Sequence, residues 1–151
     1  ITVSLDVGPG PRGDCMDAGV RATIGRAGPD IADGSAVTVT GQLLPAIAAG
    51  GRDTFGAAVA EIDRLNGAWY TDEQGGVYRP PVGILVDELD ASPAVSGVGQ
   101  SSWGPTVYGV TGRAAAAEAR DAAETALDTA GVGGEVWVVT PRNAGATVKT
   151  D

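Results

Sequence analysis

The sequence contains no histidine, and its only cysteine and only lysine are Cys15 and Lys149. The usual ligand set of a zinc site is therefore missing. A single cysteine cannot form a disulfide within the chain, which favours a reducing, cytoplasmic location. Lys149 stands near the end of the sequence, so any proton transfer elsewhere must use a carboxylate, a tyrosine or the cysteine. No pair of such residues stands out from the sequence, and the catalytic residues stay unknown at this stage.

Aromatic residues and basic residues are also scarce. Aromatic side chains make up only 5% of the chain, so we expect a core of small side chains. The chain has 10 basic and 19 acidic residues, which gives a net charge of −9. Nucleic-acid binding needs a basic face that displaces counterions from phosphates, and it is not expected here. No apolar run approaches the roughly 20 residues of a membrane span, so we expect no membrane partner.

The acidic balance suggests a particular kind of source. A high negative charge keeps a protein soluble where salt screens its self-repulsion. Nine of the ten basic residues are arginine, so the composition is also poor in lysine. We hypothesise that the sequence comes from a salt-loving archaeon.

Hydrophobic periodicity predicts four helices. Pro45 should kink or end the first of them. Asp53 should cap the second helix and Gly67 should end it. The expected helices cover Ile31–Ala48, Asp53–Asn66, Val82–Leu89 and Arg113–Ala130.

Three further segments read as strands. Ile1–Val7 alternates apolar and polar residues, Thr106–Thr111 is rich in β-formers, and Glu135–Thr140 reads as a buried strand. The order of helices and strands predicts an α+β sandwich, with helices on one face of a small antiparallel sheet. The length of 151 residues fits one domain. Because the sequence opens directly inside its first strand, we expect a fragment or a gene that has lost its front.

The first candidate site is the glycine-rich stretch Ser96–Val110. Its glycines suit a long hairpin loop, and that simple structural role is one interpretation. The other is an anion cradle, in which successive backbone N–H groups converge on a phosphate beside a tryptophan wall. The candidate binding residues are Gly97, Gly99, Gln100, Ser101, Ser102, Trp103 and Gly104.

The second candidate site is the polar stretch Tyr70–Pro81, which reads as a loop. It offers an amide, a phenol and a guanidinium next to a glycine pair, and the guanidinium can hold a phosphate or carboxylate through two parallel hydrogen bonds. The candidates are Gln74, Gly75, Gly76, Tyr78 and Arg79.

The segment Gly97–Tyr108 resembles the C-terminal glycine-rich motif of archaeal β-ribofuranosylaminobenzene 5'-phosphate synthases, a branch of the GHMP-kinase-like superfamily. Further matching segments follow the same order along the chain: Leu43–Ala46 with Asp53–Gly56, Gln74–Pro80, and Pro141–Ala146. The resemblance covers nearly the whole chain. It implies a ferredoxin-like two-layer domain of the C-terminal type over residues 1–151, without the phosphate-binding N-terminal half.

The resemblance also implies a chemistry. Such a synthase transfers the ribosyl phosphate of phosphoribosyl pyrophosphate to the ring carbon of 4-aminobenzoate or 4-hydroxybenzoate, with loss of carbon dioxide and pyrophosphate, in tetrahydromethanopterin biosynthesis. It implies Mg²⁺ on the leaving pyrophosphate and makes Trp103 or Tyr78 a candidate for stacking on the aromatic acid. Because the N-terminal half is missing, we expect this chain to be incomplete as an enzyme on its own.

Two alternatives remain open. One is a small-molecule kinase of the same superfamily that binds ATP, although Gln100–Pro105 departs from the expected kinase form of this loop. The other is a non-catalytic remnant or interaction domain that pairs with a separate N-terminal half or forms a homodimer.

Overall fold

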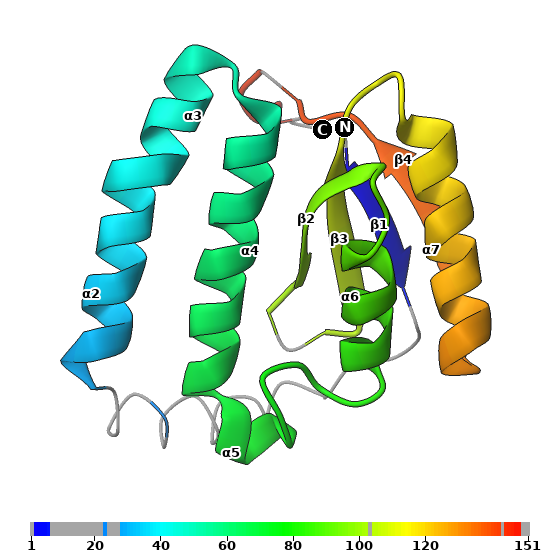
Figure 1. Ribbon diagram of the computed structural model, residues 1–151, viewed down its shortest axis with the longest axis horizontal. Helices are drawn as coiled ribbons and strands as arrows, with labels where there is room; N and C mark the ends of the chain where they lie inside the picture. The colour runs from blue at the N-terminus through cyan, green and yellow to red at the C-terminus, as the bar shows by residue number, and fades with distance from the viewer. Residues whose placement is uncertain (1, 7–22, 24–27, 103, 143, 149–151) are drawn as a thin grey trace.

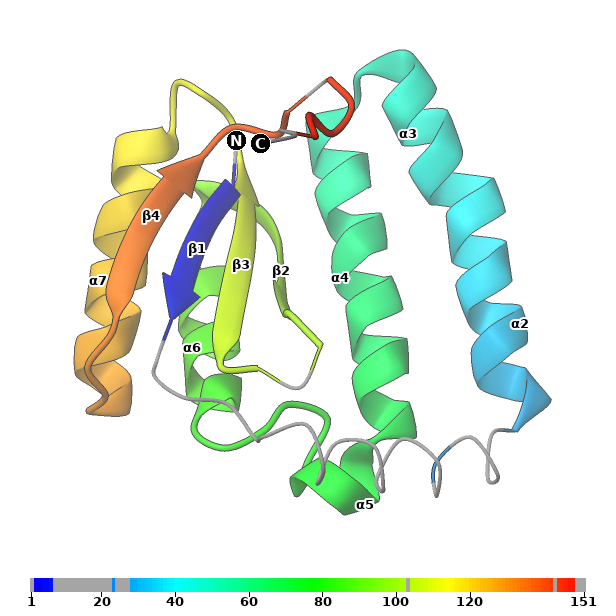
Figure 2. The same ribbon diagram turned by 180° about the vertical axis from the view of Figure 1, so that it is seen from behind.

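The computed structural model describes residues 2–6, 23, 28–102, 104–142 and 144–148. Its centre is a four-stranded antiparallel sheet, with helices α6 and α7 in front of the sheet in Figure 1 and behind it in Figure 2. The order across the sheet is β2-β3-β1-β4. The strands are β1 (Thr2–Asp6), β2 (Val95–Gln100), β3 (Thr106–Thr111) and β4 (Glu135–Val139).

Two helices complete a ferredoxin-like arrangement. Helix α6 (Val82–Asp90) precedes β2, and helix α7 (Ala116–Ala130) connects β3 to β4. The connectivity β-α-β-β-α-β with antiparallel pairing throughout is that of the ferredoxin-like fold. The predicted fold class, an α+β sandwich with helices on one face of a small antiparallel sheet, is confirmed.

The core lies between the sheet and these two helices. Leu85 and Leu89 of α6 and Val107 of β3 are completely buried in it. Helix α7 contributes three alanines with no exposed surface, which allows it to approach the sheet and α6 closely: Ala119, Ala123 and Ala126. As the scarcity of aromatic residues predicts, the core is built of small and branched aliphatic side chains.

The connection between β1 and β2 contains several helices in addition to α6. Helix α4 lies beside β2, and the α2–α3 segment packs on the outer side of α4 (Figure 1). Leu44 donates its N–H to the carbonyl of Val39, five residues back, which makes the segment between α2 and α3 a π-helical turn. Pro45 has no N–H to donate, and the loss of its regular bond accounts for the irregular turn just before it. The elements are α2 (Pro29–Thr38), η1 (Val39–Leu43), α3 (Leu44–Ala49), α4 (Arg52–Trp69) and α5 (Thr71–Gln74).

The predicted ends of α4 were wrong at both sides. Asp53 makes no capping hydrogen bond, and its carboxylate instead accepts a 2.8 Å hydrogen bond from the hydroxyl of Ser96. Gly67 does not end the helix, which continues to Trp69. Its missing side chain is required for packing, because a Cβ there would collide with the carbonyl oxygen of Val77.

Strand β4 is exposed, although its apolar run predicted a buried strand. Trp137, Val138 and Val139 are 45%, 40% and 44% exposed. The cause is topology, because β4 is the outermost strand and α7 covers only one face of the sheet near it (Figure 2).

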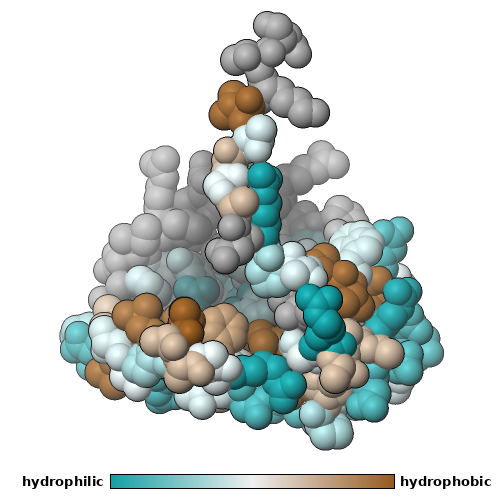
Figure 3. All heavy atoms as spheres, turned by 90° about the horizontal axis from the view of Figure 1, so that it is seen from above, coloured by the Kyte–Doolittle hydropathy of each residue, from teal (hydrophilic) through white to brown (hydrophobic). Residues whose placement is uncertain are grey.

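The surface from the second half of α2 to the end of α3 carries no charge. From Gly34 to Gly51 the sequence has no acidic or basic residue, and Val37, Leu44 and Ile47 are more than half exposed. Hydrophobic residues gather at the end of the molecule where α3 lies, on the left in Figure 3. Among the described residues, no helix has the length and apolar character needed to cross a membrane.

Candidate functional site

Gln100, the last residue of β2, brings the two candidate segments together. Its side-chain amide nitrogen donates to Oε1 of Gln74 over 3.1 Å and to the carbonyl of Ser102 over 2.7 Å. Its Oε1 accepts the backbone N–H of Arg79 at 2.8 Å. The side chain is therefore bonded to both the 74–79 segment and the loop after β2, and only 4% of the residue is exposed.

The side chain of Gln74 is also fully hydrogen-bonded. Its Nε2 donates to the carbonyls of Gly67, at 3.2 Å, and Val77, at 2.7 Å. The two predicted amide ligands, Gln74 and Gln100, thus use their hydrogen-bonding groups to hold the two segments in place. Their contribution to a binding site is positional, because their amides face each other and the backbone.

Gly97 and Gly99 lie in strand β2, so the prediction that they belong to a loop was wrong. A Cβ on Gly97 would collide with the backbone of Gly56 in α4, and a Cβ on Gly99 would collide with Tyr108 and Asp63. Packing against α4 and β3 therefore explains both glycines. Glycine density alone could not distinguish this close helix–strand contact from a flexible turn.

The loop between β2 and β3 is short, and most of its described N–H groups are engaged. The N–H of Ser101 donates to Thr106 and that of Gly104 to Ser101, while Gln100 donates to Asp63. Ser102 has a left-handed backbone with φ 55°, and its carbonyl is held by Gln100. The groups this loop presents outward are the hydroxyls of two exposed serines, Ser101 and Ser102. Trp103 lies outside the described residues.

The 74–79 segment presents one cationic group. Gly75 has φ 84°, which ends helix α5 and turns the chain toward Gly76. Tyr78 packs against the hydrophobic core, and burial together with the charge of Asp63 raises its pKa to about 12. Arg79 is half-buried, and within the described part of the chain no hydrogen bond or ion pair engages its guanidinium. Arg79 is therefore an available cation in the segment whose backbone Gln100 holds.

Asp63 and Tyr108 form a half-buried polar pair that the sequence did not predict. The hydroxyl of Tyr108 donates to the carboxylate of Asp63, which also accepts the N–H of Gln100 at 2.8 Å. Burial raises the pKa of Asp63 despite these two hydrogen bonds, and burial and the nearby carboxylate raise the pKa of Tyr108. One feature of the sequence could have indicated this pair. Asp63 follows the apolar Val59 by four residues, which places the carboxylate on the same face of the helix as that apolar side chain.

A cavity of about 420 Å³ opens beside this pair, between α2, η1, α4 and β3. Its polar part is formed by Ser35, Asp63, Asn66 and Tyr108. The rest of the wall is mainly hydrophobic and includes Ile31, Leu43, Val59, Ile62 and Trp69. A concave, mostly apolar site with a few convergent polar groups is the usual form of a small-molecule pocket.

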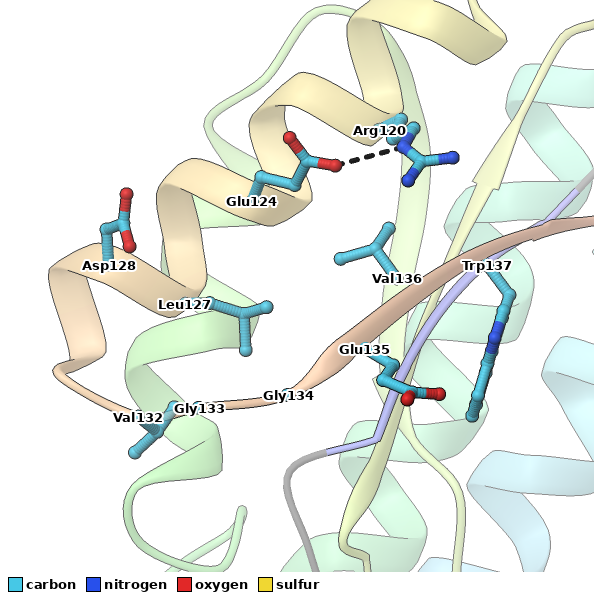
Figure 4. A pocket seen from close by; sticks show the side chains of 10 residues that line it. All are labelled: Arg120, Glu124, Leu127, Asp128, Val132, Gly133, Gly134, Glu135, Val136 and Trp137. Carbon is cyan, nitrogen blue, oxygen red and sulfur yellow. Dashed lines mark hydrogen bonds and ion pairs between the residues drawn. The ribbon is translucent and has the colours of Figure 1, made fainter.

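A second, larger cavity of about 830 Å³ lies between α7 and β4 (Figure 4). Arg120, its one basic residue, is paired with Glu124 at 2.9 Å, and Asp128 and Glu135 add further negative charge. An anionic ligand would meet net repulsion there. The cavity also lies on the α7–β4 side, away from both candidate segments. We therefore place the candidate site at the smaller cavity and the loops beside it.

The described residues do not fit a resident Mg²⁺ ion. Among them, no group of three acidic, histidine or cysteine side chains is placed to hold a metal. Asp63, the carboxylate beside the loops, already accepts two hydrogen bonds from the protein. The described side chains therefore supply no preformed set of ligands for the metal that the resemblance implies.

The fold and the site together define a ferredoxin-like domain with an extended first crossover and a candidate pocket where that extension meets the sheet. The family described as GHMP kinases C terminal matches residues 43–129, which is more than half of the 151 residues. The chain belongs to this family. The comparison with curated proteins found no match.

Proposed function

We propose that the chain carries part of the active site of a decarboxylating ribosyl-phosphate transferase, which joins phosphoribosyl pyrophosphate to 4-aminobenzoate or 4-hydroxybenzoate. Membership of the GHMP superfamily is consistent with this activity. The observation that carries the proposal is the Gln74–Gln100 hydrogen bond at 3.1 Å. It joins the two segments whose sequences resemble the synthase motifs, although they lie far apart along the chain.

The proposed phosphate contacts are the groups that these segments leave available. Arg79 offers a guanidinium that can bind two phosphate oxygens at once. Ser101 and Ser102 are exposed and can donate their hydroxyls. Because the chain has a net charge of −9, binding of a pyrophosphate depends on such local donors. Mg²⁺ would enter with the pyrophosphate.

Isothermal titration of phosphoribosyl pyrophosphate and Mg²⁺ into the full chain in molar KCl tests this proposal. We expect saturable binding that Arg79→Ala weakens by about tenfold or more, the size expected for loss of a charge-assisted hydrogen bond. Arg113→Ala is the matched control, because Arg113 is exposed and follows β3, at the opposite end of that strand from the loop between β2 and β3. Equal binding by the two variants, or none by the wild type, contradicts the proposal.

A small-molecule kinase is the second candidate function, because the matching family is one of kinases. The same titration with ATP and Mg²⁺ distinguishes the two. Tighter binding of ATP than of phosphoribosyl pyrophosphate, with the same dependence on Arg79, would favour the kinase.

A further inference from the structure

We infer that the 420 Å³ cavity between α2, α4 and β3 binds the aromatic ring of the acceptor substrate, with an amino or hydroxyl substituent directed at Asp63. This inference rests on the proposed function for the identity of its ligand. Its physical basis is the shape and chemistry of the cavity, which lies next to the loops proposed to bind phosphate.

The walls of the cavity suit a flat apolar ring. Ile31 comes from α2, Leu43 from η1, and Val59 and Ile62 from α4, with Trp69 at the end of the same helix. These side chains offer hydrophobic and aromatic contact surface, which favours burial of a ring. The volume falls within the range of about 300–1,000 Å³ that is typical of small-molecule sites.

The polar end of the cavity selects for a hydrogen-bond donor. An ionised carboxylate only accepts hydrogen bonds, and it can accept about four. Asp63 receives two, from Tyr108 and Gln100, so it can accept a further one. An amino or hydroxyl group on the ligand can supply a third. A ligand carboxylate at this end would instead repel Asp63. The ring therefore binds with its donor substituent at Asp63 and its carboxylate directed away.

The position of Asp63 links the cavity to the other half of the proposed site. Its Oδ2 accepts the N–H of Gln100 at 2.8 Å, and the side chain of Gln100 holds the carbonyl of Ser102 and the N–H of Arg79. Gln100 thus lies between the acceptor cavity and both segments proposed to contact phosphate. Two substrates held on either side of Gln100 would be neighbours, as a transfer between them requires.

Titration of 4-aminobenzoate into the full chain, without phosphoribosyl pyrophosphate, tests the inference. Benzoate is the matched probe, because it keeps the ring and the carboxylate but lacks the donor. We expect saturable binding of 4-aminobenzoate and about tenfold weaker binding of benzoate, since a hydrogen bond to a charged acceptor is lost. Asp63→Asn should reduce this preference for the amino compound.

A pair of variants separates the cavity from other surfaces. Ala32→Trp places a large side chain at a residue that lines the cavity, whereas Val37→Trp places one on another side of the same helix, at a residue that is 68% exposed and outside the cavity lining. We expect Ala32→Trp to weaken binding of 4-aminobenzoate by at least about tenfold and Val37→Trp to leave it unchanged. Thermal melting of both variants verifies that they are folded.

The inference is overturned if the folded wild type does not bind 4-aminobenzoate, or if the two tryptophan variants bind it equally well. These results are separate from those of the phosphate titration. Binding of 4-aminobenzoate without any binding of phosphoribosyl pyrophosphate would support the cavity and contradict the transferase. Binding of phosphoribosyl pyrophosphate alone would do the reverse.

Discussion

The side chains of Gln74 and Gln100 are hydrogen-bonded to each other at 3.1 Å. Gln74 also donates to the carbonyls of Gly67 and Val77, whereas Gln100 accepts the N–H of Arg79 and donates to the carbonyl of Ser102. Both residues are buried. An arrangement of this kind fixes the relative position of two surface segments by a few directional bonds, because every polar atom in it has a partner. It is the main reason to treat the two segments as one site.

Removal of the Gln100 side chain should therefore destabilise the protein and release both segments. Gln100→Ala leaves the buried Oε1 of Gln74 and two part-buried backbone groups without their partners. An unpaired buried group costs about 1–3 kcal/mol, and we expect a total loss of about 3 kcal/mol. Urea unfolding measures it. Gln42→Ala, at an exposed position, should stay within about 0.5 kcal/mol. Amide exchange at Arg79 adds a local readout, because its N–H loses its acceptor; unchanged exchange would argue against this role.

The contact between α4 and β2 should be intolerant of a single methyl group. A Cβ on Gly56 would collide with the backbone of Ser96, so neither partner can yield by rotating a side chain. We expect Gly56→Ala to cost about 3 kcal/mol or more, near the upper end for overpacking. At Gly41 a Cβ meets open space, and Gly41→Ala should be neutral or stabilising by up to about 1 kcal/mol. Equal unfolding midpoints for the two variants would disprove the close contact.

The pH dependence of stability should have opposite signs at two aspartates. Burial raises the pKa of Asp63 in the folded state, so its favourable contribution is complete below the unfolded pKa of 3.8 and is lost as pH rises through the folded value. Hydrogen bonds from Ser96 and Arg52 lower the pKa of Asp53, whose contribution is present above pH 3.8 and is lost as pH falls. Urea unfolding between pH 3 and pH 7 should show Asp63→Asn gaining stability relative to wild type with rising pH, and Asp53→Asn losing it. Parallel profiles would refute the assignment.

Salt should stabilise the fold. The three ion pairs among the described residues are exposed, and each contributes at most about 1 kcal/mol. The acidic excess, in contrast, gives a net charge of −9, and none of the charged residues falls between Gly34 and Gly51. Between about 0.1 M and molar KCl, we expect the melting temperature to rise by several degrees as repulsion is screened. The exposed charge reversals Asp121→Lys and Asp128→Lys should make the low-salt form more stable and flatten this dependence. A melting temperature that does not respond to KCl would contradict the salt-loving hypothesis.

The sequence predicted the elements that carry their own local signals. Helix α7 has an alanine-rich stretch before Gly131, and the helix ends there with Gly131 in the left-handed conformation. The burial of β4 and the role of Gly97 were misjudged, because both depend on neighbours contributed by distant segments. The sequence indicated the stretches around Gln74 and Gln100 as two separate candidate sites, and the hydrogen bond between these residues joins them only in the folded structure. The Asp63–Tyr108 pair was not predicted, because its two residues are brought together only by the packing of α4 on the sheet.

The order of the strands has a consequence for how the chain assembles. Strand β1 comes first in the sequence but lies between β3 and β4, with Thr2 opposite Val110 and Val139. The elements from α6 to α7 can meet through short connections. Strand β1, in contrast, pairs with residues that are a hundred or more positions away, and such long-range closure is slow. Within the described sheet, β4 pairs with β1 alone. The amino-terminal strand thus attaches the last strand to the sheet, and its loss would release the end of the chain as well as the beginning.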